Sequence, residues 1–385
     1  RQTTDLEVRS STLLGRAMNF LFHIIKNLLL FIKMIENINL SDLKNNQHLK
    51  KNFFTSNLNN LNESCTYFSG NFFLDPLNYY PITEDFKSFN QLFTRIDKNS
   101  VAHYHSDAFF NNLKNKLDNL KVFNDSCVIG SSPGNNYFSN LIHFLPRVFF
   151  ENEKQVKVLV HRNLPSKFRS FLKYLYSLKN IKLTFAYLDD DFYKFEKSKI
   201  PQFLNVHSSI NLLKSIRNIM PNNRKGYDKI YVRREDANYR IILNESDLIE
   251  KLKKNGFYVI NTSQYEILDQ IDFFINAKIV LSPYGSGLAN IVFCKPGTKI
   301  FEIGPNSSHV YDQTLSKRYE NLCKICNLHY HKFICDSVDV KNHNQTSKKY
   351  IHQGMLKDSN FFKNMILKLS DMDLILKKIQ QPMDE

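Results

Sequence analysis

The chain has no tryptophan, few cysteines for its length and no long uninterrupted hydrophobic run. Six cysteines in 385 residues are too few for the disulfide framework of a small secreted domain. Residues 13–35 form the most hydrophobic segment, but Lys26 and Lys33 interrupt it, which argues against a transmembrane span. No internal repeat at a fixed period is visible, so the chain does not read as a repeat array.

Aromatic and basic residues are abundant instead. The chain contains 32 Phe and 19 Tyr within a hydrophobic fraction of 42%, enough for a buried core, and its length allows two domains. Lys and Arg total 52 against 37 Asp and Glu, a formal net charge of +15. This surplus predicts an anionic partner: nucleic acid, a membrane surface or a phosphorylated substrate. The heavy use of Lys, Asn and Ile also fits an AT-rich genome. The lysines are scattered and no nucleic-acid-binding motif appears, so we do not expect nucleic acid as the partner, and a basic nucleic-acid-binding protein is the alternative from another class.

Residues 13–35 carry polar side chains on one predicted helical face and large apolar side chains on the other. The polar side chains recur every three or four positions, at Asn19, His23, Lys26, Asn27 and Lys33. This pattern favours an interfacial helix whose lysines face an anionic membrane, and a helix packed on the protein's own core is the alternative. We therefore expect residues 1–40 to form a membrane-proximal amphipathic helix.

Strands and helices alternate along most of the remaining chain, which is the pattern of a parallel α/β sheet. In the first half, an apolar run at 127–130 is followed by predicted strands at 156–160 and 181–188, with a helix at 165–178 between them. Residues 195–225 contain Pro201, Pro221 and several lysines and are expected to connect two domains. The predicted domains span 41–210 and 226–335, and a helical extension is expected at 336–385.

The second half has the clearest pattern. It predicts strands at 228–234, 257–262, 278–284 and 299–304. Asn244 is expected to cap a helix that ends near Asn255, with Gly256 at the C′ position. Ser263 and Glu266 have the spacing of a capping box that opens a helix to about Ala277. A short helix at 285–293 precedes the last strand, so four strands and three helices predict a doubly wound domain.

Gly285 and Gly287 fall where the third of these strands gives way to the next helix. In an open α/β sheet this edge is where ligands bind, and free amides at a helix start favour an anion such as phosphate. A tight turn without a ligand is the alternative. A dinucleotide fingerprint would need a third glycine where Asn290 stands, in the first βα unit of its domain. The position therefore favours a nucleoside-diphosphate site in the second domain of a two-domain transferase.

Four segments in order resemble glycosyltransferase family 61, which includes bacterial polysaccharide enzymes and eukaryotic xylosyl- and N-acetylglucosaminyltransferases. The resemblance runs from about Asn136 to Tyr330. Its segments are "NNYFSNLIHFLPR", "YVRREDANYRIILNE", "SPYGSGLANIVFCKPGTKIFEIGP" and "RYENLCKICNLHY". The chain departs from the family pattern in four positions: Tyr284 replaces a histidine, Ser139 and Asn140 replace a histidine and a tryptophan, and His143 replaces a carboxylate. A catalytically impaired protein that binds a nucleotide sugar is therefore the alternative to an active enzyme.

The resemblance implies an α/β, GT-B-like fold, with two Rossmann-like domains and a cleft between them. It implies an inverting glycosyltransferase that needs neither metal nor cofactor and transfers a sugar from a nucleotide sugar to a glycan acceptor. The expected donor is a UDP-sugar. The enzyme would be cytoplasmic and peripheral to the membrane in a bacterium, or in the Golgi or ER lumen of a eukaryote. The expected donor-binding residues are Arg233, Arg234, Arg240, Tyr284, Gly285, Ser286, Gly287 and Glu302. The expected acceptor-side residues are Asn136, Tyr137, Ser139 and Arg147.

The catalytic base and a cluster of metal-binding residue types remain to be placed. His143 is the candidate base because imidazole can accept a proton near neutral pH, and the group His103, His105 and Asp107 is a second candidate.

One segment close to the end of the resemblance is rich in residue types that bind zinc: Cys323, Cys326, His329, His331 and Cys335. Zinc ligands must converge on one point, and the family pattern places the first two within a helix, so we expect core cysteines and no metal.

Overall fold

The computed structural model describes thirteen stretches of the chain: 36–38, 53–58, 63–75, 80–89, 107–129, 136–150, 154–189, 191–219, 226–235, 237, 239–305, 317–338 and 363–381. The predicted interfacial helix at 13–35 and the histidines His103 and His105 lie outside them. Within the described stretches, no helix is both long and apolar enough to cross a bilayer. The chain divides into two compact units, the first comprising Arg1–Phe54, Tyr67–Ser126 and Asp189–Gln202, and the second the remainder.

Unit 1 is built mainly of antiparallel strands. Strand β3 (Glu63–Asp75) pairs antiparallel with β4 (Tyr80–Thr83) and with β10 (Tyr193–Pro201). Phe72 of β3 and Phe195 of β10 stack with ring centroids 5.0 Å apart in its core. The other elements are β1 (Glu36–Ile38), β5 (Lys87–Phe89), α4 (Asp107–Lys116), η3 (Leu117–Asn119) and β6 (Lys121–Asn124). Strand β2 (Phe53–Leu58) belongs mostly to unit 2.

The predicted connection at 195–225 contains the boundary between the two units, which falls between Gln202 and Phe203. Most of this stretch is regular structure, the end of β10 followed by helix α6 (Val206–Ile219). Apolar side chains such as Phe195 and Ile200 are buried within β10, although lysines separate them in the sequence. The lysines between these apolar residues are the more exposed side chains of the strand.

The first part of unit 2 is a parallel βαβ arrangement. β7 (Cys127–Val128), β8 (Gln155–His161) and β9 (Lys182–Leu188) pair in parallel, and α5 (Ser166–Leu178) connects the last two. The strands predicted at 156–160 and 181–188 and the helix between them are confirmed. A helical segment, η4 (Ser139–Phe144) followed by η5 (Leu145–Phe150), precedes β8.

The second part of unit 2 is a sheet of six strands in the order β12-β11-β13-β14-β15-β16. The first five are parallel and β16 is antiparallel to β15. The α/β class is therefore confirmed, and all four strands predicted in this part of the chain are present. The elements are β11 (Lys229–Val232), α7 (Glu245–Lys254), β12 (Tyr258–Ile260), η6 (Thr262–Gln264), α8 (Ile267–Asn276), β13 (Ile279–Pro283), η7 (Ser286–Phe293), β14 (Lys299–Pro305), α10 (Arg318–Cys326), β15 (His329–Val338), β16 (Asn364–Ile366) and α12 (Leu369–Gln380).

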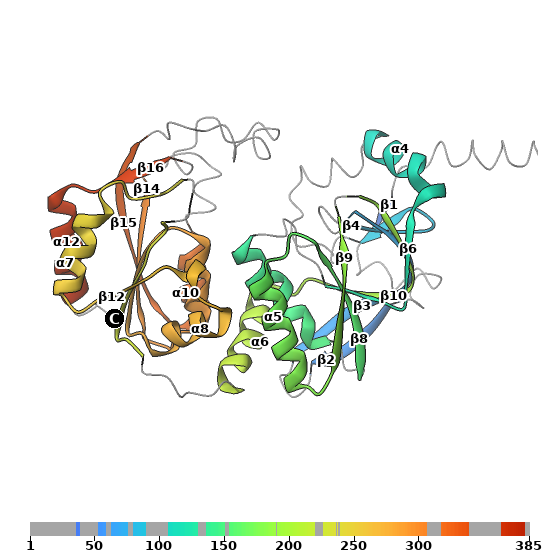
Figure 1. The fold of residues 1–385 in the computed structure, drawn as a ribbon, viewed down its shortest axis with the longest axis horizontal. Helices are drawn as coiled ribbons and strands as arrows, with labels where there is room; N and C mark the ends of the chain where they lie inside the picture. The colour runs from blue at the N-terminus through green and yellow to red at the C-terminus, as the bar shows by residue number, and fades with distance from the viewer. Residues whose placement is uncertain are drawn as a thin grey trace, which may run out of the picture. The chain divides into compact units, whose positions relative to one another are not determined.

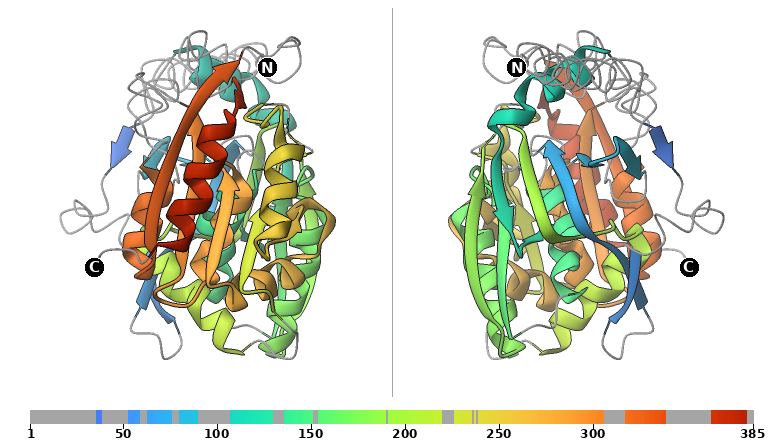
Figure 2. Two further views of the ribbon diagram at one scale, coloured as in Figure 1. Left: turned by 90° about the vertical axis from the view of Figure 1, so that its left-hand side faces the viewer. Right: turned by 90° about the vertical axis from the view of Figure 1, so that its right-hand side faces the viewer.

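Helices cover both faces of this sheet. Helices α7 and α12 lie on one face and α8 and α10 on the other (Figure 1), and the left panel of Figure 2 looks onto the α7 and α12 face. Phe301 and Ile303 of β14 belong to the core beneath α7 and α12, together with Leu248 and Ile375 from those helices. Side chains alternate along a strand, so Glu302 points to the opposite face.

The helix-cap predictions have mixed outcomes. Gly256 has φ +80° just after α7, as a C′ glycine should, because that left-handed conformation strains residues with a side chain. Asn244 precedes α7 but its side chain bonds Leu367 instead of capping the helix. The Ser263–Glu266 capping box is wrong, since the Asn261 side chain accepts the Ser263 N–H and opens the short helix η6.

Candidate functional site

The six-stranded sheet changes winding direction between β11 and β13. The chain moves from β11 to β12 on one side and then returns to β13 on the other side of β11. The connection after β11 leads to β12 on one side, and the connection after β13 leads to β14 on the other side. Connections that diverge in this way leave a space at the carboxyl ends of the two strands, which is where open α/β sheets bind ligands. Arg233 and Arg234 follow β11, and Tyr284 and Gly285 follow β13, so the predicted residues flank this point.

Gly285 provides the space that the Arg234 side chain occupies. A Cβ atom added to Gly285 would lie 2.0 Å from Nη1 of Arg234. Gly285 has extended backbone angles, φ −171° and ψ 163°, which any residue can adopt. The glycine is therefore required by the close approach of the guanidinium and not by its own conformation. Arg234 also donates from Nη2 to the carbonyl of Tyr239 over 3.3 Å.

Helix η7 begins directly after this contact. The Leu288 N–H donates to the Gly285 carbonyl over 3.0 Å, so the amides of Ser286 and Gly287 precede the first bond of the helix. A Cβ on Gly287 would lie 2.9 Å from Oγ1 of Thr262, because the turn passes close to the end of β12. Amides at a helix start that no helical bond uses can bind an anion.

A buried asparagine fixes the shape of the turn. Asn290 is completely buried, and its Nδ2 donates to the Gly287 carbonyl and to Oε1 of Gln270, both over 3.1 Å. Its Oδ1 accepts a hydrogen bond from the Tyr137 hydroxyl over 2.7 Å. Burial raises the pKa of Tyr137 well above its ordinary value, so the phenol remains the donor. Buried polar groups are costly unless paired, and here the pairs join Tyr137 to the glycine turn.

Aromatic side chains continue from the turn toward His143. The Tyr319 hydroxyl donates to the Gly285 carbonyl over 2.5 Å, and its ring meets that of Tyr284 edge to face with centroids 5.1 Å apart. The ring centroid of Phe138 lies 6.1 Å from that of Tyr319 and 5.7 Å from that of His143. His143 is partly exposed. The candidate base is thus two aromatic rings away from the glycine turn.

Arg240 is held between two tyrosines. Its guanidinium carbon lies 4.7 Å from the ring centroid of Tyr239 and 4.8 Å from that of Tyr284, which are cation–π distances. The residue is 7% exposed and has φ +60°. A left-handed conformation at a residue with a side chain costs about 1–3 kcal/mol and persists only where the surroundings enforce it.

Glu302 is fully buried among basic and hydroxyl groups. Oε2 accepts the Tyr330 hydroxyl over 3.0 Å, and Oε1 lies 3.6 Å from the Lys332 ammonium. Burial raises the pKa of Glu302 to about 7, against the lowering effects of Lys332, Tyr330 and Arg240. Lys332 is the register partner of Glu302 on β15. The carboxyl group therefore faces β15.

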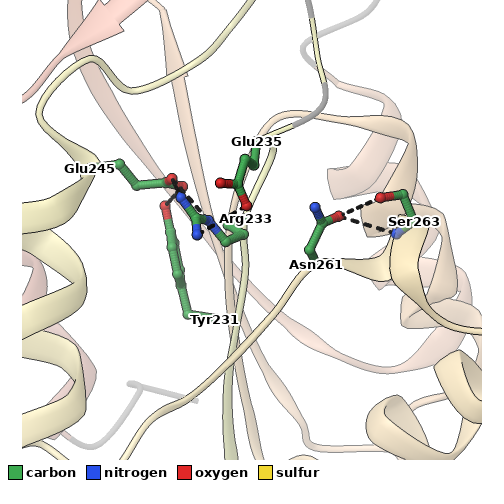
Figure 3. Close-up of polar contacts among 6 residues, drawn as sticks. All are labelled: Tyr231, Arg233, Glu235, Glu245, Asn261 and Ser263. Carbon is green, nitrogen blue, oxygen red and sulfur yellow. Dashed lines mark hydrogen bonds and ion pairs between the residues drawn. The ribbon is translucent and has the colours of Figure 1, made fainter.

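Arg233 has a structural role. Its Nε and Nη2 both donate to Oε2 of Glu245, over 3.2 and 3.1 Å, and Nη1 pairs with Glu235 (Figure 3). Glu245 is 7% exposed and its other oxygen accepts the Tyr231 hydroxyl over 2.8 Å. Arg233 thus balances a buried carboxylate at the start of α7, while the adjacent Arg234 lies against Gly285.

The remaining acceptor-side residues support the helical segment around η4. Asn136 accepts the Ser139 N–H through Oδ1 over 2.9 Å, and Ser139 is buried. Arg147 is 1% exposed and its guanidinium lies 4.0 Å from the centroid of the Phe203 ring. In this structure these three residues lie within the local packing of the segment.

The cysteine and histidine segment is divided between α10 and β15. Cys323 and Cys326 are buried on α10, and Cys335 is buried on β15 with a free thiol like the others. Burial raises the pKa of Cys335 to about 12. Across the stretches that the structure describes, no three residues of the types His, Cys, Asp and Glu are arranged to hold a metal ion.

The residues that the structure brings together therefore differ in part from the predicted set. Arg234, Arg240, Tyr284 and the turn at 285–287 are brought together around the carboxyl ends of β11 and β13, and Glu302 lies on the neighbouring strand β14. Sequence reasoning missed Tyr319, Tyr330 and Lys332, which contact Gly285 or Glu302. The parallel register of β14 and β15 places Lys332 beside Glu302, and only the pairing of the strands could have revealed this.

Together these features define a class of protein: an α/β chain with a basic, glycine-lined turn at the switch point of a parallel sheet. The family described as Glycosyltransferase 61 matches residues 22–301, well over half of the chain. The chain belongs to the glycosyltransferase 61 family, and membership implies a glycosyltransferase. A comparison with curated proteins finds no match.

The Arg233–Glu245 pair gives a first prediction. Arg233→Ala leaves a buried carboxylate without its guanidinium partner and should lower the free energy of unfolding by about 1–3 kcal/mol. Arg234→Ala, one residue further on, should change it much less. Urea denaturation followed by circular dichroism measures both. Equal stability of Arg233→Ala and the parent would contradict the structural role of Arg233.

The raised pKa of Glu302 predicts a pH dependence of stability. The folded protein holds this proton to about pH 7, whereas the unfolded chain releases it near its ordinary pKa of 4.5. The stabilisation from protonated Glu302 is complete below pH 4.5 and is lost as the pH rises to 7. Glu302→Gln should therefore gain stability relative to the parent between pH 5 and 7 and stay level above.

Glu250→Gln is the matched control for this experiment. Glu250 is exposed and Lys254 lowers its pKa, so its ionisation is complete below the range tested. Its stability difference from the parent should be constant between pH 5 and 8. A Glu302→Gln difference that is equally constant would show that Glu302 does not titrate in this range.

Proposed function

We propose that the chain is an inverting, metal-independent glycosyltransferase. It transfers a sugar from a nucleotide sugar to the hydroxyl of a glycan acceptor in polysaccharide or glycoconjugate biosynthesis. A UDP-sugar is the proposed donor. The family match supports glycosyl transfer. The observation that carries the donor assignment is the placement of the Arg234 guanidinium against the Gly285 backbone, at the switch point between β11 and β13.

The donor diphosphate is proposed to bind at this contact. A diphosphate needs positive charge and amide donors, and Arg234 can supply the charge while Ser286 and Gly287 supply amides at the start of η7. The same groups would stabilise the negative charge that develops on the leaving diphosphate during transfer. Arg233 is not included in this set, because its side chain is engaged with Glu245.

Two further donor-site residues are given roles according to their placement. Arg240 is proposed to add positive charge beside Tyr284, where its guanidinium is already held. Glu302 is fully buried. We therefore assign it to the charge balance with Arg240 and Lys332, in preference to a direct contact with the ribose.

Transfer with inversion also needs a base that removes the proton of the acceptor hydroxyl. His143 is the proposed base, because it is partly exposed and linked through Phe138 and Tyr319 to the glycine turn. The acceptor would approach from the side of the helical segment at η4, and a GT-B arrangement with a cleft would place donor and acceptor on facing domains. An impaired protein that only binds the donor is the second reading, since Tyr284 replaces the family's histidine and its ring packs on Arg240.

The proposal is tested by screening nucleotide sugars for thermal stabilisation and then assaying the best binder with glycan acceptors. Binding with release of the nucleoside diphosphate and a new glycosidic bond is the expected result. Binding without transfer would favour the impaired protein. Absence of binding to every nucleotide sugar would contradict the donor site.

The Gly285 contact gives a sharper prediction. Arg234→Ala should weaken the binding of UDP by about 1.5–3 kcal/mol, roughly tenfold to a hundredfold. Gly285→Ala adds a methyl group where Nη1 of Arg234 lies, and the flexible arginine should move while the fold is retained. Both single variants and the double variant should bind UDP equally weakly in calorimetric titrations, because they remove the same contact.

Gly297→Ala is a control for the glycine substitution, since its backbone is strained for alanine but no atom lies within 4 Å of an added Cβ. It should lose stability without losing affinity for UDP. Losses that add up in the Arg234→Ala, Gly285→Ala double variant would show that the two residues act separately.

The membrane proposal rests on residues 13–35, which lie outside the described residues. We propose that they hold the enzyme at an anionic membrane surface, which corresponds to a cytoplasmic, peripheral location in a bacterium or a luminal one in a eukaryote. Deleting residues 1–36 should abolish co-sedimentation with vesicles that contain anionic lipid. Neutral vesicles provide the control. Equal sedimentation of the deletion variant and the parent would exclude this role.

A further inference from the structure

The segment that carries Arg240 is bonded to the C-terminal part of the chain. The Arg240 N–H donates to the Lys363 carbonyl over 2.9 Å, and the Ile241 N–H donates to Oδ1 of Asn364 over 3.2 Å. Met365 then exchanges two bonds with this segment: its N–H donates to the Ile241 carbonyl over 2.8 Å and its carbonyl accepts the Leu243 N–H over 2.9 Å.

The pairing between the two segments extends to Asn244 and Leu367. Asn244 bonds Leu367 in both directions: its Nδ2 donates to the Leu367 carbonyl over 2.7 Å and its Oδ1 accepts the Leu367 N–H over 3.1 Å. Residues 240–244 and 363–367 thus run side by side and are bonded at almost every position. We call residues 363–367 the C-terminal clamp.

The clamp is itself firmly anchored. Met365 and Leu367 are buried in the same core as Tyr231, and β16 pairs with the end of β15. Helix α12 follows directly and buries Met372, Ile375 and Ile379 in that core. Movement of the clamp would therefore require apolar side chains to leave the core, which makes it a rigid support for a loop.

The geometry of Arg240 requires such a support. Its left-handed conformation is unfavourable for an arginine, and the bond from its own N–H to Lys363 fixes the backbone at this residue. The guanidinium then lies against Tyr284, one residue before Gly285. The family match ends at residue 301, so the clamp lies in a part of the chain that the match does not cover.

We propose that the C-terminal clamp is a positioning element for donor binding, in which Lys363 and Asn364 hold Arg240 beside the glycine turn. This inference rests on the proposed donor site and adds a requirement to it: the nucleotide-binding turn is complete only with residues 363–367. Asn364 acts through Arg240 and does not itself contact the donor.

The test measures the affinity for UDP by calorimetric titration in the full chain. Asn364→Ala removes the acceptor for the Ile241 N–H and should weaken binding roughly three- to tenfold, the range of one hydrogen bond. Asp373→Ala is the matched control, because it removes an α12 contact, the exposed ion pair with Lys251, that lies away from the clamp. It should bind UDP like the parent. Melting temperatures establish that all variants are folded.

Arg240→Ala and the Arg240→Ala, Asn364→Ala double variant decide whether Asn364 acts through Arg240. The double variant should bind UDP no more weakly than Arg240→Ala alone. The inference is overturned if Asn364→Ala binds within twofold of the parent, if its effect is undiminished without Arg240, or if Asp373→Ala is equally impaired. A parent that binds no UDP would overturn the donor site, and this inference with it.

Discussion

The close approach of the Arg234 guanidinium to the Gly285 backbone is the contact on which the rest of the site depends. It requires a residue without a side chain at 285, since a Cβ there would lie 2.0 Å from Nη1. It also requires that β11 and β13 be neighbours, because Arg234 follows the end of one strand and Gly285 the end of the other. The sheet order therefore has a direct chemical consequence: a positive charge and the first amides of η7 meet at one edge.

Several buried polar groups hold this edge in place. Tyr319 donates to the carbonyl of Gly285, and Asn290 donates to that of Gly287 while its Oδ1 accepts a hydrogen bond from the Tyr137 hydroxyl. Each of these groups would be costly to bury alone, so their pairing favours one shape of the turn over others. A turn that is held in one shape before a ligand binds loses little entropy on binding.

Much of the second sheet could be predicted from the sequence, because its strands are short apolar runs separated by helices with clear periodicity. The positions of β11, β13 and β14 follow from this pattern, and so does the glycine turn. The predicted role of Arg233 shows the limit of such reasoning. Arg233 and Arg234 are adjacent arginines that both follow β11, so the sequence does not distinguish them, but only the Arg233 guanidinium bonds Glu245.

The other features that were missed depend on contacts between distant parts of the chain. Lys332 lies beside Glu302 through the register of two parallel strands, and Asn364 bonds Ile241 across more than a hundred residues. Neither contact leaves a local pattern in the sequence. Strand β10 has a weak local signal for a related reason, because an exposed strand face and a polar loop have similar composition.

A crystal structure of the protein with UDP bound tests the central claim most directly. The account predicts that the diphosphate lies at the carboxyl ends of β11 and β13, with its oxygens within hydrogen-bonding distance of the Arg234 guanidinium and the amides of Ser286 or Gly287. A diphosphate bound elsewhere on the protein, with Arg234 still lying against Gly285, would contradict it.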